Sequence, residues 1–188
     1  MDSLLVDLEA LLGAEHVLSG AAATGWAFSP WTRLGAPRAI LRPASTQEVS
    51  AILRLAHAAH APVVPWGGRT GLVDGAFAEG ALALSLDRMA AIEEIDPVGA
   101  TMTVQAGCVL ETACLAATAR DLFLPVDLGA RGSATIGGVI STNAGGNRVL
   151  RYGMTRESVL GLEAVLADGT VISSLNHLIK NNAGYDLK

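Results

Sequence analysis

One stretch decides how this sequence folds: Pro65-Trp66-Gly67-Gly68-Arg69-Thr70-Gly71-Leu72-Val73-Asp74-Gly75, residues 65–75. It directly follows a short apolar run, residues 62–65, that predicts a buried strand. Residues 67–75 contain four glycines in nine positions, so successive backbone N–H groups can form a concave site for an anion. The simpler interpretation is a tight turn that needs positive φ. This many glycines after a strand favour a phosphate site.

Two familiar nucleotide-binding loops do not match this stretch. No Gly-Lys-Ser or Gly-Lys-Thr follows, so it is not a Walker A loop. The glycines also lack the GxGxxG spacing that runs into a helix, which argues against a Rossmann NAD site. The side chains of Arg69 and Thr70 could add hydrogen-bond donors to those of the backbone.

A second glycine-rich region spans residues 127–148. Small residues and hydroxyls alternate with glycine there, and a planar ring or a diphosphate could lie against such backbone. Ser133, Thr142 and Asn143 would then be hydrogen-bond partners. The alternative is a flexible surface loop, but the apolar residues of this region and the lack of an acid after Asp127 favour a packed segment.

The rest of the chain alternates helical and strand patterns. Helices are predicted over residues 2–12, 45–60 and 109–120, strands over 39–41, 62–65, 81–86, 92–95 and 101–106, and a hairpin over 160–173. A capping box at residues 45–48 opens the second helix, and Asp168-Gly169 marks the hairpin turn. Residues 20–37 lack a pattern and are expected to wrap as a loop. This order predicts an α+β fold with two small lobes that meet near residue 105.

Composition excludes several classes of protein. The net charge of −5, with no basic stripe, argues against nucleic-acid binding. Mean hydropathy is +0.41, yet no apolar run approaches the roughly 18 residues of a transmembrane segment. The N-terminus has no positively charged start and is not a signal peptide. Cys108 and Cys114 fit neither a zinc pair nor a redox motif, so we expect reduced thiols and a cytoplasmic protein.

Metal-binding and acid–base patterns are also missing. His57 and His60 lie near the end of one predicted helix without a third ligand in view. Glu93 and Glu94 are adjacent on a predicted strand and point to opposite faces. We therefore expect no metal site and no catalytic residue in this chain.

Several motifs, taken in order, resemble the FAD-linked oxidases of the vanillyl-alcohol oxidase type. These are residues 105–111, 128–146 and 159–170. Residues 65–71 and 180–188 resemble a narrower group, the D-2-hydroxyglutarate dehydrogenases with their D-lactate dehydrogenase and glycolate oxidase relatives. The resemblance covers roughly residues 38–188.

The resemblance implies a two-lobed, α+β FAD-binding domain of the vanillyl-alcohol oxidase (PCMH) type, truncated in its second lobe. Residues 1–37 would be an extension of helix and loop, 38–104 the first lobe and 105–188 the incomplete second lobe. The first loop would hold the FAD pyrophosphate, and the second region would lie along the flavin and ribityl. The cofactor-binding residues so implied are Pro65, Trp66, Gly67, Gly68, Arg69, Thr70, Gly71, Leu72, Gly132, Ser133, Ile136, Gly137, Gly138, Thr142, Asn143 and Gly145.

Two details of the first loop bear on the cofactor. Some members of the wider family attach FAD through a histidine of this loop. The loop here has none, so FAD is expected to bind non-covalently. Arg69 stands where close relatives often carry a small polar residue such as asparagine.

The activity implied is oxidation of a D-2-hydroxy acid, of the 2-hydroxyglutarate, lactate or glycolate type, by hydride transfer from C2 to flavin N5. In this flavoprotein family the base and the metal ligands lie in a later substrate domain, so we expect the chain by itself to be an inactive oxidoreductase fragment. An open second lobe leads us to expect self-association, weak FAD affinity, or both. The alternatives are an FAD-dependent enolpyruvate-type reductase and a non-catalytic FAD- or nucleotide-binding module.

Overall fold

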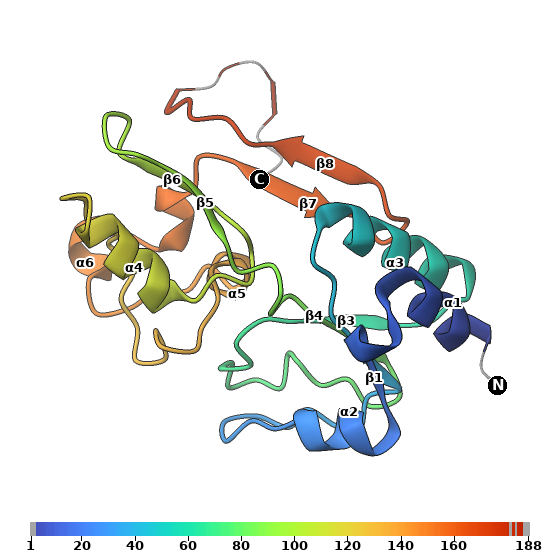
Figure 1. Ribbon diagram of the computed structural model, residues 1–188. Helices are drawn as coiled ribbons and strands as arrows, with labels where there is room; N and C mark the ends of the chain where they lie inside the picture. The colour runs from blue at the N-terminus through green and yellow to red at the C-terminus, as the bar shows by residue number, and fades with distance from the viewer. Residues whose placement is uncertain (1–2, 181, 183, 186–188) are drawn as a thin grey trace.

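The computed structural model describes residues 3–180, 182, 184 and 185 (Figure 1). The central element is a four-stranded sheet in the order β1-β2-β4-β3. Its strands are β1 (Val17–Ser19), β2 (Ala39–Leu41), β4 (Leu82–Ser85) and β3 (Val63–Trp66). β1 is antiparallel to β2, whereas β2, β4 and β3 are parallel.

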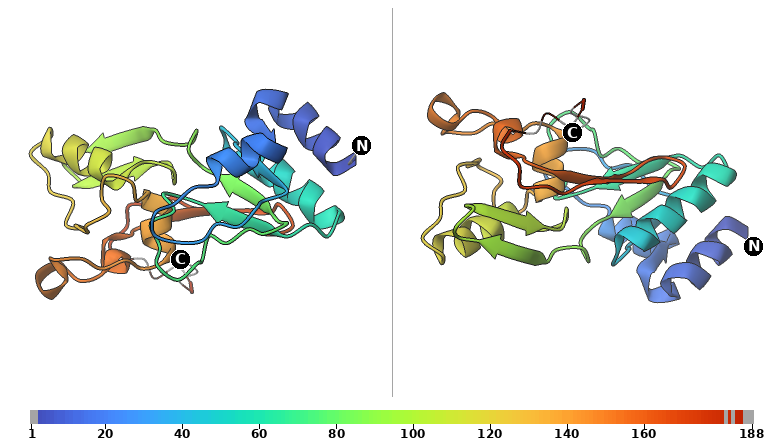
Figure 2. Two further views of the ribbon diagram at one scale, coloured as in Figure 1. Left: turned by 90° about the horizontal axis from the view of Figure 1, so that it is seen from below. Right: turned by 90° about the horizontal axis from the view of Figure 1, so that it is seen from above.

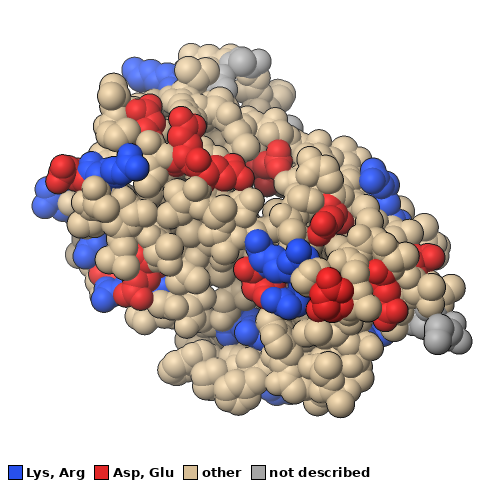
Figure 3. Space-filling model, viewed as in Figure 1, with Lys and Arg blue, Asp and Glu red and all other residues tan. Residues whose placement is uncertain are grey.

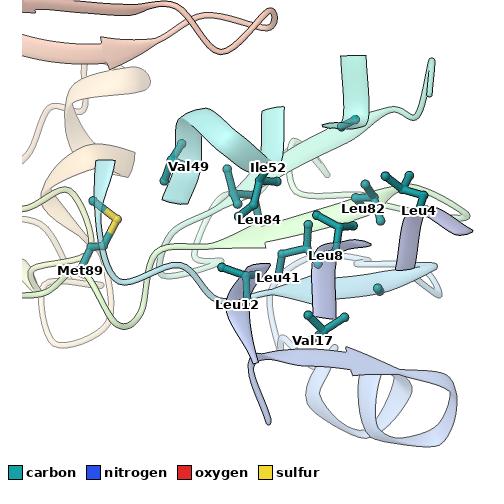
Figure 4. Close-up of a cluster of buried hydrophobic side chains, with 12 residues drawn as sticks. Leu4, Leu8, Leu12, Val17, Leu41, Val49, Ile52, Leu82, Leu84 and Met89 are labelled. Atoms are coloured by element: carbon teal, nitrogen blue, oxygen red, sulfur yellow. The ribbon is translucent and has the colours of Figure 1, made fainter. Parts of the chain in front are cut away.

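Helices cover both faces of this sheet, as a parallel sheet requires. Every residue of β2 and β4 is buried. The helices α1 (Ser3–Leu12) and α3 (Thr46–Ala58) pack on one face, where Leu8 and Ile52 meet Leu41 (Figure 4). The short helix α2 (Gly20–Trp26) packs on the other face, where Ala23 belongs to the same cluster as Ile40.

The start of α3 shows why the helix begins where it does. The backbone N–H of Glu48 donates to Ser45 Oγ over 3.2 Å, and the N–H of Ala44 donates to Glu48 Oε2 over 2.7 Å. These reciprocal bonds satisfy donors that the first helical turn leaves unpaired. The predicted capping box is confirmed, with the glutamate reaching one residue before the cap.

The second half of the chain forms two hairpins and a small core. β5 (Ile92–Asp96) pairs with β6 (Thr101–Val104), and β7 (Leu162–Val165) pairs with β8 (Val171–Ser174). The helices here are α4 (Leu110–Thr118), α5 (Ile136–Ser141) and α6 (Val149–Tyr152), with the 3₁₀ turn η2 (Thr155–Ser158). Another 3₁₀ turn, η1 (Ala14–His16), lies in the first half, between α1 and β1. Leu110, Ala134 and Val139 form the core of this half.

The β7–β8 hairpin folds back over α3 of the first half (Figures 1 and 2). Ser50 Oγ donates to the carbonyl of Gly169 over 2.6 Å, and Thr46 Oγ1 donates to Glu163 Oε1 over 2.6 Å. The first of these hydrogen bonds is buried and the second is exposed. Together they join α3 to the hairpin across more than a hundred positions of sequence.

Most predicted elements are confirmed, but one region differs from expectation. Residues 20–26 form α2 rather than loop, because burial of Ala23 stabilises a short helix that its own sequence does not signal. In the second glycine-rich region, Ala134, Thr135 and Val139 are buried, whereas residues 131–133, 141 and 142 are exposed, so the packed interpretation holds for the middle of the region alone. The predicted boundaries 1–37, 38–104 and 105–188 stay predictions, and β1 of the first segment pairs with β2 of the second.

Among the described residues, no helix combines the length and apolar character needed to cross a bilayer. Lys and Arg are interspersed with Asp and Glu on the face drawn in Figure 3.

Candidate functional site

The two glycine-rich regions meet in the structure. A Cβ atom added at Gly68 would overlap the carbonyl oxygen of Ser133, and one added at Gly67 would overlap Thr135 Oγ1. Only glycine allows backbone to approach this closely. The first loop and residues 133–135 therefore form one continuous surface.

A groove of about 410 Å³ lies along this surface, within the range of roughly 300–1,000 Å³ found for small-molecule sites. Five segments line it, and the first loop is the central one. The lining residues are Phe28, Ser29, Pro30, Trp31, Gly67, Gly68, Arg69, Thr70, Leu86, Asp87, Ala90, Gly107, Val109, Ser133 and Thr135.

The hydroxyl of Thr135 is the most informative atom of the groove. Thr135 is only 8% exposed, and Oγ1 has no hydrogen-bond partner in the protein. An unpaired buried hydroxyl costs roughly 1–3 kcal/mol of desolvation. Thr135 also lines the groove, so a ligand bound there is a candidate for the missing partner.

Arg69 turns its side chain toward Trp26, the last residue of α2. Its guanidinium lies 4.3 Å from the ring centroid of Trp26, and Nη1 donates to the Trp26 carbonyl over 3.0 Å. Burial lowers the pKa of Arg69, and the negative charge of Asp87 partly opposes this effect. Arg69 thus adds positive charge to the groove while it fixes the loop.

Asp74 holds the other end of the first loop. It accepts hydrogen bonds from Thr32 Oγ1 at 2.7 Å, from the backbone N–H of Arg33 at 3.0 Å and from Arg33 Nε at 2.7 Å. The bond from Thr32, followed by those from Arg33, lowers the pKa of Asp74 to about 2. The loop is therefore tied at Arg69 and at Asp74 to residues that precede β2.

Asp87 is the acid that lines the groove, and it is paired. Burial would raise its pKa, but hydrogen bonds from Arg42 and Ser85 outweigh burial and hold the pKa below its ordinary value. Arg42 Nη2 lies 2.6 Å from Asp87 Oδ2. This pairing offsets the negative charge that would otherwise repel a phosphate.

The structure brings five of the predicted site residues into the groove: Gly67, Gly68, Arg69, Thr70 and Ser133. The other four of the first stretch do not line it. Trp66 is 1% exposed in the core, Pro65 belongs to β3, Leu72 is 75% exposed and Gly71 is also exposed.

The remaining predicted residues of the second region do not line the groove: Gly132, Ile136, Gly137, Gly138, Thr142, Asn143 and Gly145. Thr142 Oγ1 donates to the carbonyl of Gly138 over 2.9 Å. Asn143 Oδ1 accepts from the N–H of Arg156 over 2.9 Å. Gly137 packs against Ala106, so its small size has a structural use. Their contacts with a cofactor stay predictions.

Sequence reasoning missed ten lining residues: Phe28, Ser29, Pro30, Trp31, Leu86, Asp87, Ala90, Gly107, Val109 and Thr135. Thr135 and Gly107 lay within motifs that were already singled out. The three aromatic residues of 26–31 stood out in a chain with only 4% aromatics, which was a usable signal. Residues 86–90 carried no local signal.

A second hollow lies away from the predicted residues. Its volume is about 340 Å³, and it lies beside α6, lined by Phe123, Asn147, Arg148, Leu150, Arg151 and Tyr152, none of them a predicted site residue. Among the residues that the structure describes, no three His, Cys, Asp or Glu side chains are placed to hold a metal ion.

Comparison with known proteins agrees with this geometry. A family model described as FAD binding domain matches residues 37–174. The D-2-hydroxyglutarate dehydrogenase of Xanthomonas citri pv. viticola is 50% identical over 161 residues, which cover 84% of this chain and 34% of that protein. The mitochondrial D-2-hydroxyglutarate dehydrogenase of Bos taurus is 48% identical over 163 residues, which cover 84% of this chain and 30% of that protein. The chain thus spans about a third of these relatives.

Solved structures show the same fold at low identity. An alkyldihydroxyacetonephosphate synthase matches with a TM-score of 0.82 and 18% identity, over 93% of this chain and 38% of that chain. A p-cresol methylhydroxylase matches with a TM-score of 0.67 and 20% identity, over 91% of this chain and 34% of that chain. The predicted PCMH-type fold is confirmed. The chain belongs to the FAD binding domain family, and FAD is its cofactor.

Proposed function

We propose that this chain is the FAD-binding part of a dehydrogenase that oxidises a D-2-hydroxy acid to the 2-oxo acid. One observation carries the proposal: the two glycine-rich regions meet along a groove that contains the unpaired hydroxyl of Thr135. The relatives at about half identity are named D-2-hydroxyglutarate dehydrogenases, which supports this substrate class.

The residues present fit FAD. Gly67 and Gly68 leave backbone open to a diphosphate, Thr135 offers a hydroxyl without a partner, and Arg69 adds positive charge. We propose that these residues, with Thr70 and Ser133, hold the diphosphate part of FAD. When bound, FAD accepts the hydride that leaves C2 of the hydroxy acid. The protein's own part is to position the cofactor and exclude water.

Non-covalent binding is part of the proposal. Among the described residues that line the groove there is no histidine or cysteine to which a flavin could be attached. The chain is purified with added FAD, desalted and examined for visible flavin absorption, and then precipitated with acid. We expect the flavin colour to remain in the supernatant. Colour in the pellet would contradict non-covalent binding, and no bound flavin at high FAD would contradict the proposed function.

We further propose that substrate is bound by residues outside this chain. The chain spans 30% of its Bos taurus relative, so the activity of the whole enzyme goes beyond the groove described. D-2-hydroxyglutarate, D-lactate and glycolate are added in turn to the FAD-loaded chain without oxygen. We expect the oxidised flavin spectrum to persist. Bleaching by a D-hydroxy acid, but not by its L-isomer, would show that the chain already contains a substrate site.

Self-association through the β7–β8 hairpin is a further proposal. Val171, Ile172 and Leu175 are 43%, 38% and 51% exposed, and in the described part of the chain β8 pairs only with β7. Open strand edges with apolar side chains favour pairing with a second chain. Sedimentation velocity over a range of concentrations should show dimers or larger species that Ile172→Lys disperses. A monomer at every concentration would contradict this.

We also propose that the protein works in the cytoplasm. The thiols of Cys108 and Cys114 are both free, as is usual in a reducing compartment. The name of the Bos taurus relative places that protein in mitochondria. Fractionation of cells that express the gene would decide, and recovery in an organelle fraction would contradict the proposal.

A further inference from the structure

We infer that residues 26–31, the aromatic segment, belong to the cofactor site: their polar atoms fix the first loop, and the rings of Phe28 and Trp31 stack on a planar ring of the dinucleotide. The segment precedes residues 37–174, which the family model matches. The inference rests on the proposed function, because it takes FAD as the ligand of the groove.

Hydrogen bonds join the aromatic segment to the first loop. Ser29 Oγ donates to the carbonyl of Arg69 over 2.9 Å and accepts from the N–H of Trp31 over 3.2 Å. Arg69 Nη1 donates in return to the carbonyl of Trp26 over 3.0 Å. Arg69 has a φ of +55°, which is uncommon for a residue with a side chain. These bonds hold it in that conformation, so the segment sets the shape of the loop.

Aromatic packing strengthens the same junction. The rings of Trp26 and Trp66 are stacked, with centroids 6.2 Å apart and planes 8° apart. The guanidinium of Arg69 lies 4.3 Å from the first centroid and 5.7 Å from the second. Trp66 is buried and donates Nε1 to the carbonyl of Ala76 over 2.7 Å. The rings of Trp26 and Trp66 therefore pack against other groups of the protein.

Phe28 and Trp31 differ from them, because both line the groove and both face solvent. Phe28 is 72% exposed and Trp31 is 63% exposed. These two large aromatic rings are exposed to water beside the proposed phosphate-binding loop. Packing inside the protein does not account for their position. A planar heteroaromatic ring is the ligand group that such rings bind by stacking.

The first loop separates two sides of the groove. Gly67 and Gly68 contact residues 133–135, whereas Arg69 contacts the aromatic segment. A diphosphate held by the loop has a ring system attached through sugar or ribityl on each side. One of these, adenine or isoalloxazine, is then directed toward Phe28 and Trp31.

The test compares FAD affinity, by flavin titration, in wild type, Phe28→Ala, Trp31→Ala and the double variant. Phe123→Ala is the matched control, since Phe123 is 53% exposed and lines the hollow beside α6 instead. We expect each groove variant to weaken FAD binding by about tenfold and the control to leave it unchanged. Thermal unfolding without FAD is measured in parallel and is expected to stay the same.

Two conservative variants separate stacking from folding. Trp31→Phe keeps a ring and is expected to retain affinity, whereas Phe28→Leu keeps bulk without a ring and is expected to lose it. ADP and FMN, measured on wild type and the double variant, identify the ring that stacks, because only the ligand that carries it loses affinity. Unchanged FAD affinity in the double variant would overturn the inference. Failure of the wild type to bind FAD would instead overturn the proposed function.

Discussion

At Gly68 the absence of a Cβ atom lets two distant segments touch. An alanine there would overlap the carbonyl of Ser133 and force the segments apart. We expect Gly68→Ala to lower the free energy of unfolding by about 1–3 kcal/mol and to weaken FAD binding by about tenfold or more. Chemical denaturation and flavin titration measure the two effects.

Gly71 supplies a matched control in the same loop. A Cβ at Gly71 would meet nothing within 4 Å, and its backbone does not have positive φ. Gly71→Ala should change the free energy of unfolding by no more than about 0.5 kcal/mol. Equal effects at the two positions would show that contact with Ser133 is not what requires glycine.

A substitution at Thr135 should change FAD affinity and protein stability in different ways. Thr135→Val removes a hydroxyl that is buried without a partner, so the FAD-free protein should be as stable or about 1 kcal/mol more stable. FAD affinity should fall by about tenfold, because the ligand loses a hydrogen bond in a buried site. Thermal unfolding and flavin titration measure the two changes.

Thr155 is the control for this substitution. It is 4% exposed, and its Oγ1 donates to the carbonyl of Ala144 over 2.6 Å. Thr155→Val removes this buried hydrogen bond and should lower the free energy of unfolding by about 1 kcal/mol, with little effect on FAD. If both variants behaved alike, the hydroxyl of Thr135 would have no special part in binding.

At the scale of elements, the first loop depends on a carboxylate. Hydrogen bonds from Thr32 and Arg33 lower the pKa of Asp74 from 3.8 to about 2. Because the folded-state pKa is depressed, this stabilisation is fully present above pH 3.8 and is lost as the pH falls through about 2. Wild type should therefore lose stability over this window more steeply than Asp74→Asn. The thermal unfolding temperature of both proteins is measured as a function of pH. Two curves that coincide would contradict this prediction.

Elements with a local signal were predictable from sequence. The capping box of Ser45 and Glu48 predicted the start of α3, and Asp168-Gly169 predicted the turn between β7 and β8. The helix α2 was not predicted, because its seven residues Gly20–Trp26 include two glycines and show little apolar spacing. Its stability comes from the sheet on which Ala23 packs.

At the scale of the whole molecule, the β7–β8 hairpin is held by α3. Ser50 Oγ is buried and donates to Gly169, 119 residues away. Ser50→Ala should lower the free energy of unfolding by about 1–2 kcal/mol and speed amide hydrogen exchange in β7 and β8. Ser173→Ala, at an exposed position of β8, is the control and should leave exchange unchanged. Equal exchange in both variants would show that the hairpin does not depend on α3.

The sequence by itself determined the local elements, the PCMH-type fold and the central loop of the site. Gly67, Gly68 and Ser133 were named from their motifs, because glycine spacing and hydroxyl pattern are signals that lie within a few residues. Only the tertiary structure decided which segments share the groove. Ser29 contacts Arg69 across forty positions, and residues 86–90 join from a third segment. Such contacts arise from packing between elements, and packing over long separations leaves no periodic pattern in the residues that make it.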